Sequence, residues 1–165
     1  MINISGFGTG VYIVALETFP QGFSVSQFAD DEDPISAENL DAIGYEMMYD
    51  GSLFAFDKAS PVIVDVAVIP GSEDDENLKV LLQTKKGGQN LLPIGDVTSM
   101  VINYPNNGFV TLSNGTIVNG PIVDSIQSSG RKKGNVYRFA FGSFAGTQSI
   151  KQALATVGSA ALEIF

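Results

Sequence analysis

The chain has 165 residues, a length typical of a single domain, and contains no cysteine and no histidine. Disulfides, thiolate nucleophiles, Ser-His-Asp triads and metal sites built from cysteine or histidine are therefore excluded. Charged residues make up 16% of the chain, against about 25% in typical soluble domains. This low fraction predicts that partner molecules cover much of the surface.

Acidic and basic residues are unevenly distributed along the chain. Eighteen acids and nine bases give a net charge of −9. Residues 1–78 contain fifteen acids and one base, whereas residues 79–165 contain three acids and eight bases. The simpler interpretation is an acidic protein whose two halves are mixed in space; the alternative is a molecule with unlike faces that stacks on its own copies. In neither case is nucleic acid expected to bind through neutralised phosphates.

No targeting or membrane segment is expected from the hydropathy pattern. Residues 1–10 lack a basic start, and the apolar run at 11–16 is too short for a membrane helix. The longest apolar stretch, 62–69, is interrupted by Asp65. No membrane partner is therefore predicted.

The dominant pattern along the chain is that of β-strands. The predicted strands cover 11–16, 22–28, 43–49, 53–56, 62–69, 97–104, 109–112, 122–127 and 136–141. Asp50-Gly51 predicts a two-residue hairpin turn, because both residue types tolerate positive φ. The segment 105–108 predicts a second hairpin. Gly115 after Asn114 predicts a bulge or a further turn.

A single amphipathic helix is predicted after the fifth strand. Ser72 is placed to cap its first turn, with Asp75 at the capping-box position, and Gly87 is placed to end it. A stripe of Leu78, Leu81 and Leu82 predicts the face that lies on a sheet. A second, weaker helical pattern covers 148–162. Together these patterns predict a mainly β fold, a barrel or sandwich with one flanking helix.

Motifs that carry chemistry are weak in this sequence. The glycine-rich segment 6–10 precedes a strand, whereas a phosphate-binding loop follows one, so a flexible arm is expected there. An acidic cluster could bind calcium, but it lacks the spacing of an EF-hand loop and is expected to be a solvated or electrostatic contact loop; it consists of Asp30, Asp31, Glu32 and Asp33. No metal site, cofactor or catalytic residue is predicted, and the protein is not expected to be an enzyme.

Several segments in order resemble a bacteriophage tail tube protein of the contractile-tail type, a group related to type VI secretion tube proteins. The residues that carry the resemblance are Thr18–Gly22, Gln27–Pro34, Val68–Leu78, Leu112–Thr116, Ser129–Lys133 and Tyr137–Phe141. The resemblance extends over Ile4 to Phe141. It implies a tail-tube-like β-barrel domain over residues 1–145 and a C-terminal extension over 146–165.

The resemblance also implies a structural function. Six copies would close a ring, and stacked hexameric rings would form the tail tube through which the genome passes into the host. The implied partners are further copies of the chain, the tail sheath protein, baseplate and tail terminator proteins, and DNA that passes without specific binding. The implied location is the tail of a virion assembled in the host cytoplasm. Two alternatives stay open: a baseplate or tube-initiator protein of the same fold, and a calcium-dependent binding module that uses the acidic cluster.

Assembly of this kind predicts two sets of site residues. Unlike charged loops are expected to meet between subunits, where open sheet edges also pair; the predicted contact residues are Asp30, Asp31, Glu32, Asp33, Arg131, Lys132 and Lys133. A bore that passes DNA quickly is expected to be acidic or neutral; its predicted lining is drawn from Asp50, Asp57, Asp65 and Asp124. Charge reversal at 131–133 is expected to block self-assembly and to leave the monomer folded.

Overall fold

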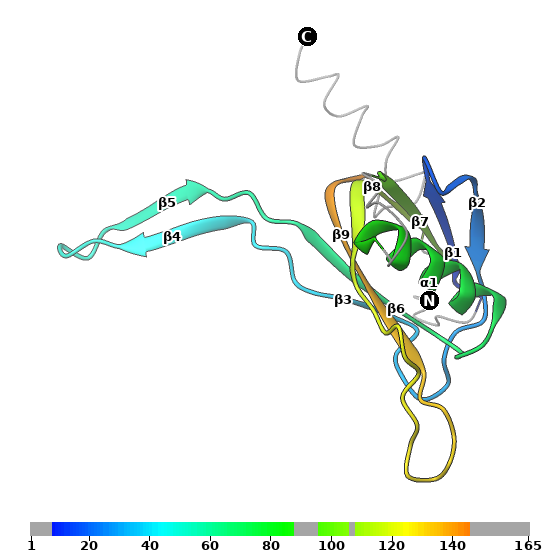
Figure 1. Cartoon of the computed structure of the whole chain (residues 1–165). Helices are drawn as coiled ribbons and strands as arrows, with labels where there is room; N and C mark the ends of the chain where they lie inside the picture. Colours follow the sequence, from blue (N-terminus) through cyan, green and yellow to red (C-terminus); the bar gives the residue numbers. More distant parts are fainter. Residues whose placement is uncertain (1–7, 88–95, 106–107, 146–165) are drawn as a thin grey trace.

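The computed structural model describes residues 8–87, 96–105 and 108–145, which form a curled antiparallel sheet, a separate hairpin and one helix (Figure 1). The seven-stranded sheet has the order β2-β1-β7-β8-β9-β6-β3, and β4 pairs only with β5. The elements are β1 (Gly10–Ala15), β2 (Phe19–Val25), β3 (Ile35–Ala37), β4 (Ile43–Met47), β5 (Leu53–Asp57), β6 (Val62–Val68), α1 (Glu73–Lys86), β7 (Thr98–Tyr104), β8 (Gly108–Asn119) and β9 (Asn135–Ala145). The predicted fold class, a mainly β barrel or sandwich with one flanking helix, is confirmed, and the main sheet curls into a half-barrel.

The core lies between the curled sheet and α1. Alternate residues of β9, namely Tyr137, Phe139 and Phe141, are buried, as the period of a half-buried strand requires. Leu78 and Leu81 of α1 are buried in the same cluster. The face of β9 that carries Arg138 points away from this core, where Arg138 Nε donates to Asp65 Oδ1 of β6 at 2.9 Å.

The helix begins and ends where the sequence predicts. Ser72 is the N-cap, and its hydroxyl accepts from the Asp75 N–H at 3.2 Å. The Asp75 carboxylate accepts from the N–H of Gly71 at 3.1 Å. In a standard capping box it would accept from the N–H of the N-cap residue, which here is Ser72. The Gly87 N–H donates to the Gln83 carbonyl and closes the last turn.

Most predicted strands are confirmed, but the predicted strand at 122–127 is wrong. Residues 120–134 form a long loop between β8 and β9, with one isolated bridge between Ile126 and Lys132. The predicted strand at 22–28 begins earlier, at Phe19, and ends at Val25. The three-residue β3 was not predicted, because three residues after Pro34 are too few to show a period.

Strand β8 is longer than the sequence pattern indicates, because it contains the predicted bulge. Thr98 pairs with Gly115 and Met100 with Leu112, so one residue of β7 faces two residues of β8. Asn114 has a φ of 55° at this point. The bulge lets the strand continue past Asn114 instead of turning.

Some predicted features lie outside the described residues. These are the helical pattern at 148–162 with the rest of the 146–165 extension, residues 6 and 7 of the glycine-rich segment, and the turn residues Asn106 and Asn107. The antiparallel pairing of β7 with β8 still confirms the second predicted hairpin.

Candidate functional site

A hairpin arm, residues 43–57, projects from the body of the molecule (Figure 1). It consists of β4 and β5, which pair antiparallel from Ile43 opposite Asp57 to Met47 opposite Leu53. Within the described residues these two strands pair with each other and with no strand of the main sheet. An isolated two-stranded hairpin is at best marginally stable in water, so an arm of this kind normally needs cover from a partner.

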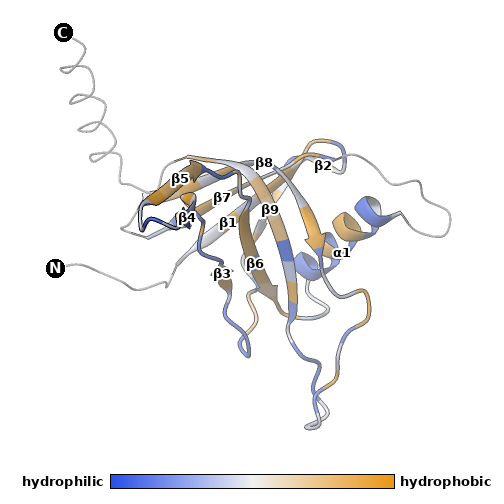
Figure 2. Cartoon of the chain, turned by 90° about the vertical axis from the view of Figure 1, so that its left-hand side faces the viewer, coloured by the Kyte–Doolittle hydropathy of each residue, from blue (hydrophilic) through white to orange (hydrophobic). Residues whose placement is uncertain are grey.

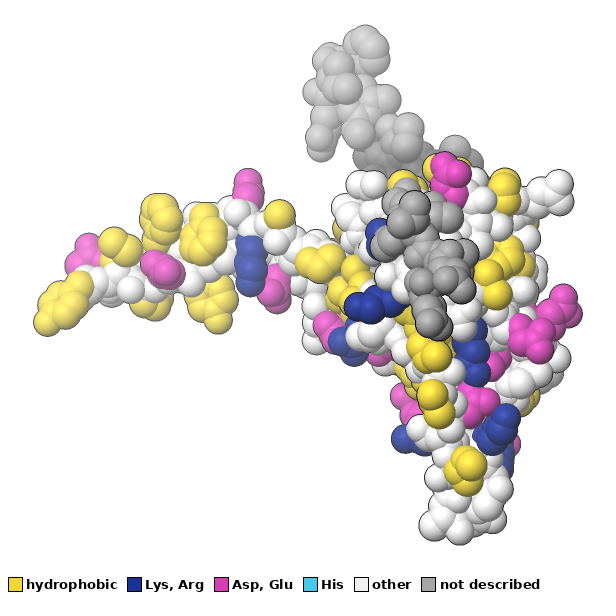
Figure 3. Space-filling model, in the orientation of Figure 1, with side chains coloured by type: hydrophobic (Ala, Val, Ile, Leu, Met, Phe, Trp, Pro, Cys, Tyr) yellow, Lys and Arg dark blue, Asp and Glu magenta, His cyan; other side chains and the backbone are white. Residues whose placement is uncertain are grey.

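Large apolar side chains project from both sides of the hairpin arm (Figure 3), and its strands contain many hydrophobic residues (Figure 2). Cross-strand partners share a face, which places Tyr45, Met47 and Leu53 on one face and Phe54 and Phe56 on the other. Tyr45 is 70% exposed and Phe54 is 56% exposed. A hairpin that lies on its own core has one apolar and one polar face. Both faces of the arm thus expose apolar side chains that the described part of the chain does not cover.

The tip of the hairpin arm is a wider turn than the predicted two-residue one. Residues 48–52 separate the strands, and the Met48 N–H donates to the Ser52 carbonyl at 2.7 Å. Gly51 is the turn residue with positive φ, 88°, and the Asp50 carboxylate accepts from the Ser52 hydroxyl and N–H. These hydrogen bonds lower the pKa of Asp50, so the tip stays negatively charged at neutral pH. Met48 and Tyr49 point outward at this tip and are exposed.

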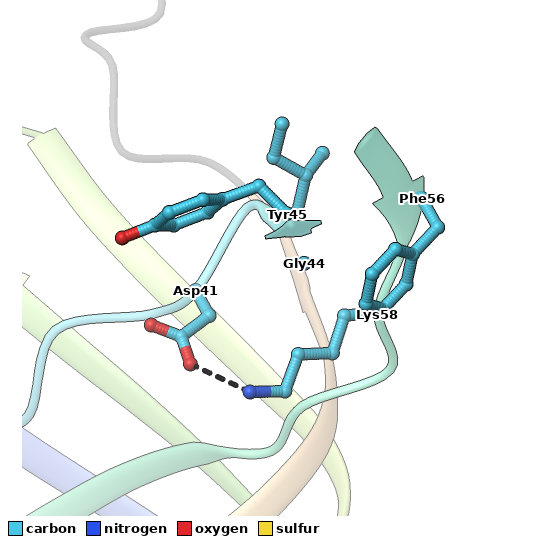
Figure 4. A pocket seen from close by; sticks show the side chains of 6 residues that line it. Asp41, Gly44, Tyr45, Phe56 and Lys58 are labelled. Carbon is cyan, nitrogen blue, oxygen red and sulfur yellow. Dashed lines mark hydrogen bonds and ion pairs between the residues drawn. The ribbon is translucent and has the colours of Figure 1, made fainter. Parts of the chain in front are cut away.

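The base of the hairpin arm is held by one ion pair and one close ring contact (Figure 4). Lys58 Nζ donates to Asp41 Oδ2 at 3.2 Å, which joins the two stems of the arm. Phe56 lies directly opposite Gly44, and a Cβ at Gly44 would come within 2.3 Å of that ring. Glycine at this position therefore lets the ring cross the neighbouring strand.

The two charged loops predicted to meet between subunits contact each other within one chain. Arg131 donates to Asp30, and Lys133 Nζ lies 3.5 Å from Glu32 Oε1. Asp31 Oδ2 accepts from the Gln127 amide at 2.8 Å and from the Gly134 N–H at 3.1 Å. The hydrogen bond from Arg131 lowers the pKa of Asp30. An inter-subunit role for these residues stays a prediction, and it would have to act in addition to these internal contacts.

A second charged cluster attaches the 120–134 loop to the helix and to β9. Asp124 accepts from Lys79 at 2.5 Å, from Lys132 at 3.0 Å and from the Asn135 amide at 2.9 Å. The three donors, Lys79 first, hold the pKa of Asp124 well below its ordinary value. A carboxylate with a lowered pKa stabilises the fold above its unfolded-state pKa, and this contribution is lost only as the pH falls towards the folded-state pKa.

Replacing Asp124 with asparagine is expected to loosen the 120–134 loop. The change removes the charge that holds both lysines, and hydrogen bonds to charged groups contribute more than neutral ones. The amides of Gln127 and Lys133, which close this loop on itself, should exchange about tenfold faster or more at neutral pH. Hydrogen exchange by NMR measures this effect. Asp33→Asn is the control, because Asp33 is exposed and has no ion pair in the described part of the chain; equal exchange in both variants would contradict the role of Asp124.

The four predicted channel residues lie in different parts of the fold. Asp50 is at the tip of the hairpin arm, and Asp57 is at the end of β5. Asp65 on β6 is paired with Arg138, and Asp124 is in the cluster of lysines. The structure thus brings none of them together within one subunit, and their exposure to a channel stays a prediction.

The described segments contain neither a metal-binding cluster nor a membrane-spanning helix. No group of three or more acidic, histidine or cysteine side chains there is arranged to hold a metal ion. In the predicted acidic cluster, Asp30, Asp31 and Glu32 are engaged by the basic loop. No helix in these segments has the length and apolar character needed to cross a membrane.

The sequence patterns predicted the hairpin but not the arm as a site. The signal present was a pair of runs, 47–49 and 53–56, in which apolar side chains follow one another without alternation. Such a run is unusual on an exposed strand, where one face is normally polar. Consecutive large apolar residues on both sides of a turn are therefore the pattern that marks an arm.

Comparison with known proteins gives one family match and likenesses to solved structures. A family model described as tail fiber protein gp32 matches residues 2–145. A chain of the anti-feeding prophage baseplate, solved by cryo-electron microscopy, is similar with a TM-score of 0.52 and 10% identity, over 88% of this chain and 95% of that chain.

A second similar chain comes from the sheath/tube terminator of PVC, an extracellular contractile injection system, in the extended state. Its TM-score is 0.54 and its identity is 10%. The alignment covers 88% of this chain and 96% of that chain. No curated protein matches the sequence. At this identity the two likenesses establish a shared fold.

Proposed function

This chain belongs to the tail fiber protein gp32 family, and we propose that it is a structural subunit that joins copies of itself into a ring at an end of a phage tail tube. The baseplate and the tube terminus are the two positions that fit this proposal, since proteins of the same fold occur in a baseplate and in a sheath/tube terminator complex. On this proposal the protein has no catalytic role. Its neighbours are other tail components, and its location is the tail of a particle assembled in the host cytoplasm.

The observation that carries the proposal is the hairpin arm with two apolar faces. Exposed side chains such as Tyr45, Met47 and Phe54 make the arm far more apolar than the surface of a lone monomer requires. A neighbour on each side would bury both faces, which is the situation of a subunit in a ring. The low fraction of charged residues, 16%, is consistent with the same interpretation.

The edges of the main sheet favour contact through side chains over extension of the sheet. One edge is β3, which has three residues, and the other is β2, which contains Pro20. Short edge strands and proline both limit strand addition. We therefore propose that the arm, and not a continuous intersubunit sheet, makes the principal contact between copies.

The repeating subunit of the tail tube, in stacked hexameric rings that conduct the genome, is the second candidate. One observation favours it: the hairpin arm and the 120–134 loop project from the body in different directions (Figure 1). A subunit at an end needs contacts around one ring, whereas a repeating subunit also needs contacts between rings. Two projections in different directions would give a repeating subunit one contact within its ring and one contact with the next ring.

Electron microscopy of the purified protein at high concentration tests both candidates. Single rings with a central hole are expected for a subunit at a tube end, and long hollow tubes are expected for a repeating subunit. The copy number in intact particles, measured by quantitative mass spectrometry against the sheath protein, gives an independent answer. A protein that stays monomeric at all concentrations and occurs in no particle would refute the proposal.

A further inference from the structure

A groove lies between the last turns of α1 and the end of β8. It has a volume of about 390 Å³ and is lined by Leu82, Lys85, Lys86, Ile117, Val118 and Ile122. Leu82 and Ile117 are buried and form its apolar floor, whereas Val118 and Ile122 are half exposed along its side. The groove is thus apolar inside and basic at one rim.

The basic rim is formed by two lysines that make no ion pair within the described part of the chain. Eight basic residues lie in the described ranges 8–87, 96–105 and 108–145, and six of them are in ion pairs: Lys58, Lys79, Arg131, Lys132, Lys133 and Arg138. Lys85 and Lys86 form no ion pair with a described residue. Charges left unpaired beside an apolar groove favour an occupant that is apolar and acidic.

The tip of the hairpin arm has this composition. Met48 and Tyr49 are exposed apolar side chains, and Tyr49 has no part of its side chain covered. Asp50 follows Tyr49 in the turn, and Glu46 lies on β4, two residues before Met48. Neither acidic residue forms an ion pair within the described part of the chain. The arm points away from the body that carries the groove (Figure 1), so the tip that fills a groove comes from another copy.

We propose that the tip of the hairpin arm of one copy docks in the groove between α1 and β8 of a second copy. Tyr49 and Met48 lie on the apolar floor, and Glu46 and Asp50 face Lys85 and Lys86. The tip and the groove are different surfaces of the same chain, so every copy both inserts an arm and accepts one. Such head-to-tail contacts close into a ring or continue as a filament. This inference rests on the proposed function, because it specifies the contact that joins the copies.

Cysteine cross-linking tests the inference directly, because the natural chain has no cysteine. The double variant Tyr49→Cys/Val118→Cys is oxidised after assembly and run on a non-reducing gel. A ladder of dimers, trimers and larger species that collapses on reduction is expected. The matched control is Tyr49→Cys/Phe144→Cys, because Phe144 is exposed but pairs with Leu112, five positions along β8 from Ile117.

The outcomes separate the docking from the proposed function. Assembly of the unmodified chain with a ladder from Val118 and none from Phe144 supports the docking. Assembly without a ladder from Val118, or with equal ladders from both positions, overturns the docking and leaves the proposed function in place. Failure of the unmodified chain to assemble, measured by sedimentation, refutes the proposed function and the docking together.

Charge exchange gives a second readout that does not depend on cross-linking. The variant Lys85→Glu/Lys86→Glu is expected to weaken self-association by about tenfold, because two exposed ion pairs are replaced by like charges. Adding Glu46→Lys/Asp50→Lys to the same chain is expected to restore much of the association. Weakening without rescue would contradict the assigned pairing.

Discussion

Replacing Asp75 with alanine is expected to lower the free energy of unfolding by about 3–5 kcal/mol, the range for removing one partner of a buried ionic network. Asp75 is 1% exposed. One carboxylate oxygen accepts from the Asn135 amide at 2.8 Å and from the Tyr137 hydroxyl at 2.7 Å. The other accepts from the Gly71 N–H and lies 3.4 Å from Lys79 Nζ.

The loss is large because the donors around Asp75 stay buried after the carboxylate is removed. Tyr137 is fully buried in the core, and this burial raises the pKa of its hydroxyl, which therefore stays a donor at neutral and moderately alkaline pH. A buried donor left without an acceptor costs about 1–3 kcal/mol. Lys79 would keep its contact with Asp124, whose hydrogen bond raises the pKa of the lysine.

Urea unfolding followed by far-ultraviolet circular dichroism measures the change at Asp75. Glu76→Ala is the matched control, because Glu76 lies in the same first turn of α1 but is exposed; its expected cost is about 0.3–1 kcal/mol from the lost helix-dipole interaction. Tyr137→Phe, which removes one donor and keeps the packing, should have an intermediate cost. Equal costs for Asp75→Ala and Glu76→Ala would contradict the buried network.

Asp75 also illustrates how much of the fold is local. The sequence predicts its place in the first turn of α1, because capping depends on residues three apart. Its burial depends on Asn135 and Tyr137, about sixty residues further along the chain, which no local pattern relates to the helix. The helix and most strands were therefore predicted, whereas the network that joins them was not.

The wrong strand at 122–127 has a similar cause. Its apolar residues Ile122, Val123 and Ile126 indicate a strand, but a strand also needs a neighbour with which to pair. The structure instead directs Asp124 to Lys79 and Lys132 and leaves Val123 and Ile126 exposed. Asp124 thus ties this segment to α1 through Lys79 and to the other side of the same loop through Lys132.

The resemblance to phage tail proteins is confirmed at the level of a tail protein family, while polymerisation into a tube stays a proposal. The charge asymmetry along the sequence also has a structural explanation within one subunit. Basic residues of the second half, such as Arg131 and Arg138, pair with acids of the first half, here Asp30 and Asp65. The acids and bases of the two halves are thus paired within one subunit at these residues, while a role of the same residues between subunits stays a prediction.

On the proposed function the hairpin arm joins the copies, so replacing its apolar residues is expected to abolish assembly without unfolding the monomer. In Tyr45→Ser/Met47→Ser/Leu53→Ser, three exposed side chains on one face become polar. Residues that dominate an interface cost about 2 kcal/mol or more each when truncated, which corresponds to about thirtyfold in affinity per residue. Because such costs are not additive, a loss of at least about a hundredfold in self-association is expected.

Stability and assembly should respond separately to this triple variant, because the arm makes no contact with the core cluster. The free energy of unfolding should change by no more than about 0.5 kcal/mol, as is usual for exposed positions. Sedimentation velocity over a range of concentrations measures the association. The matched control replaces three exposed apolar residues outside the arm, Leu16, Val80 and Val97, with serine. If the arm variant assembles as well as this control, the arm is not the contact that joins the copies.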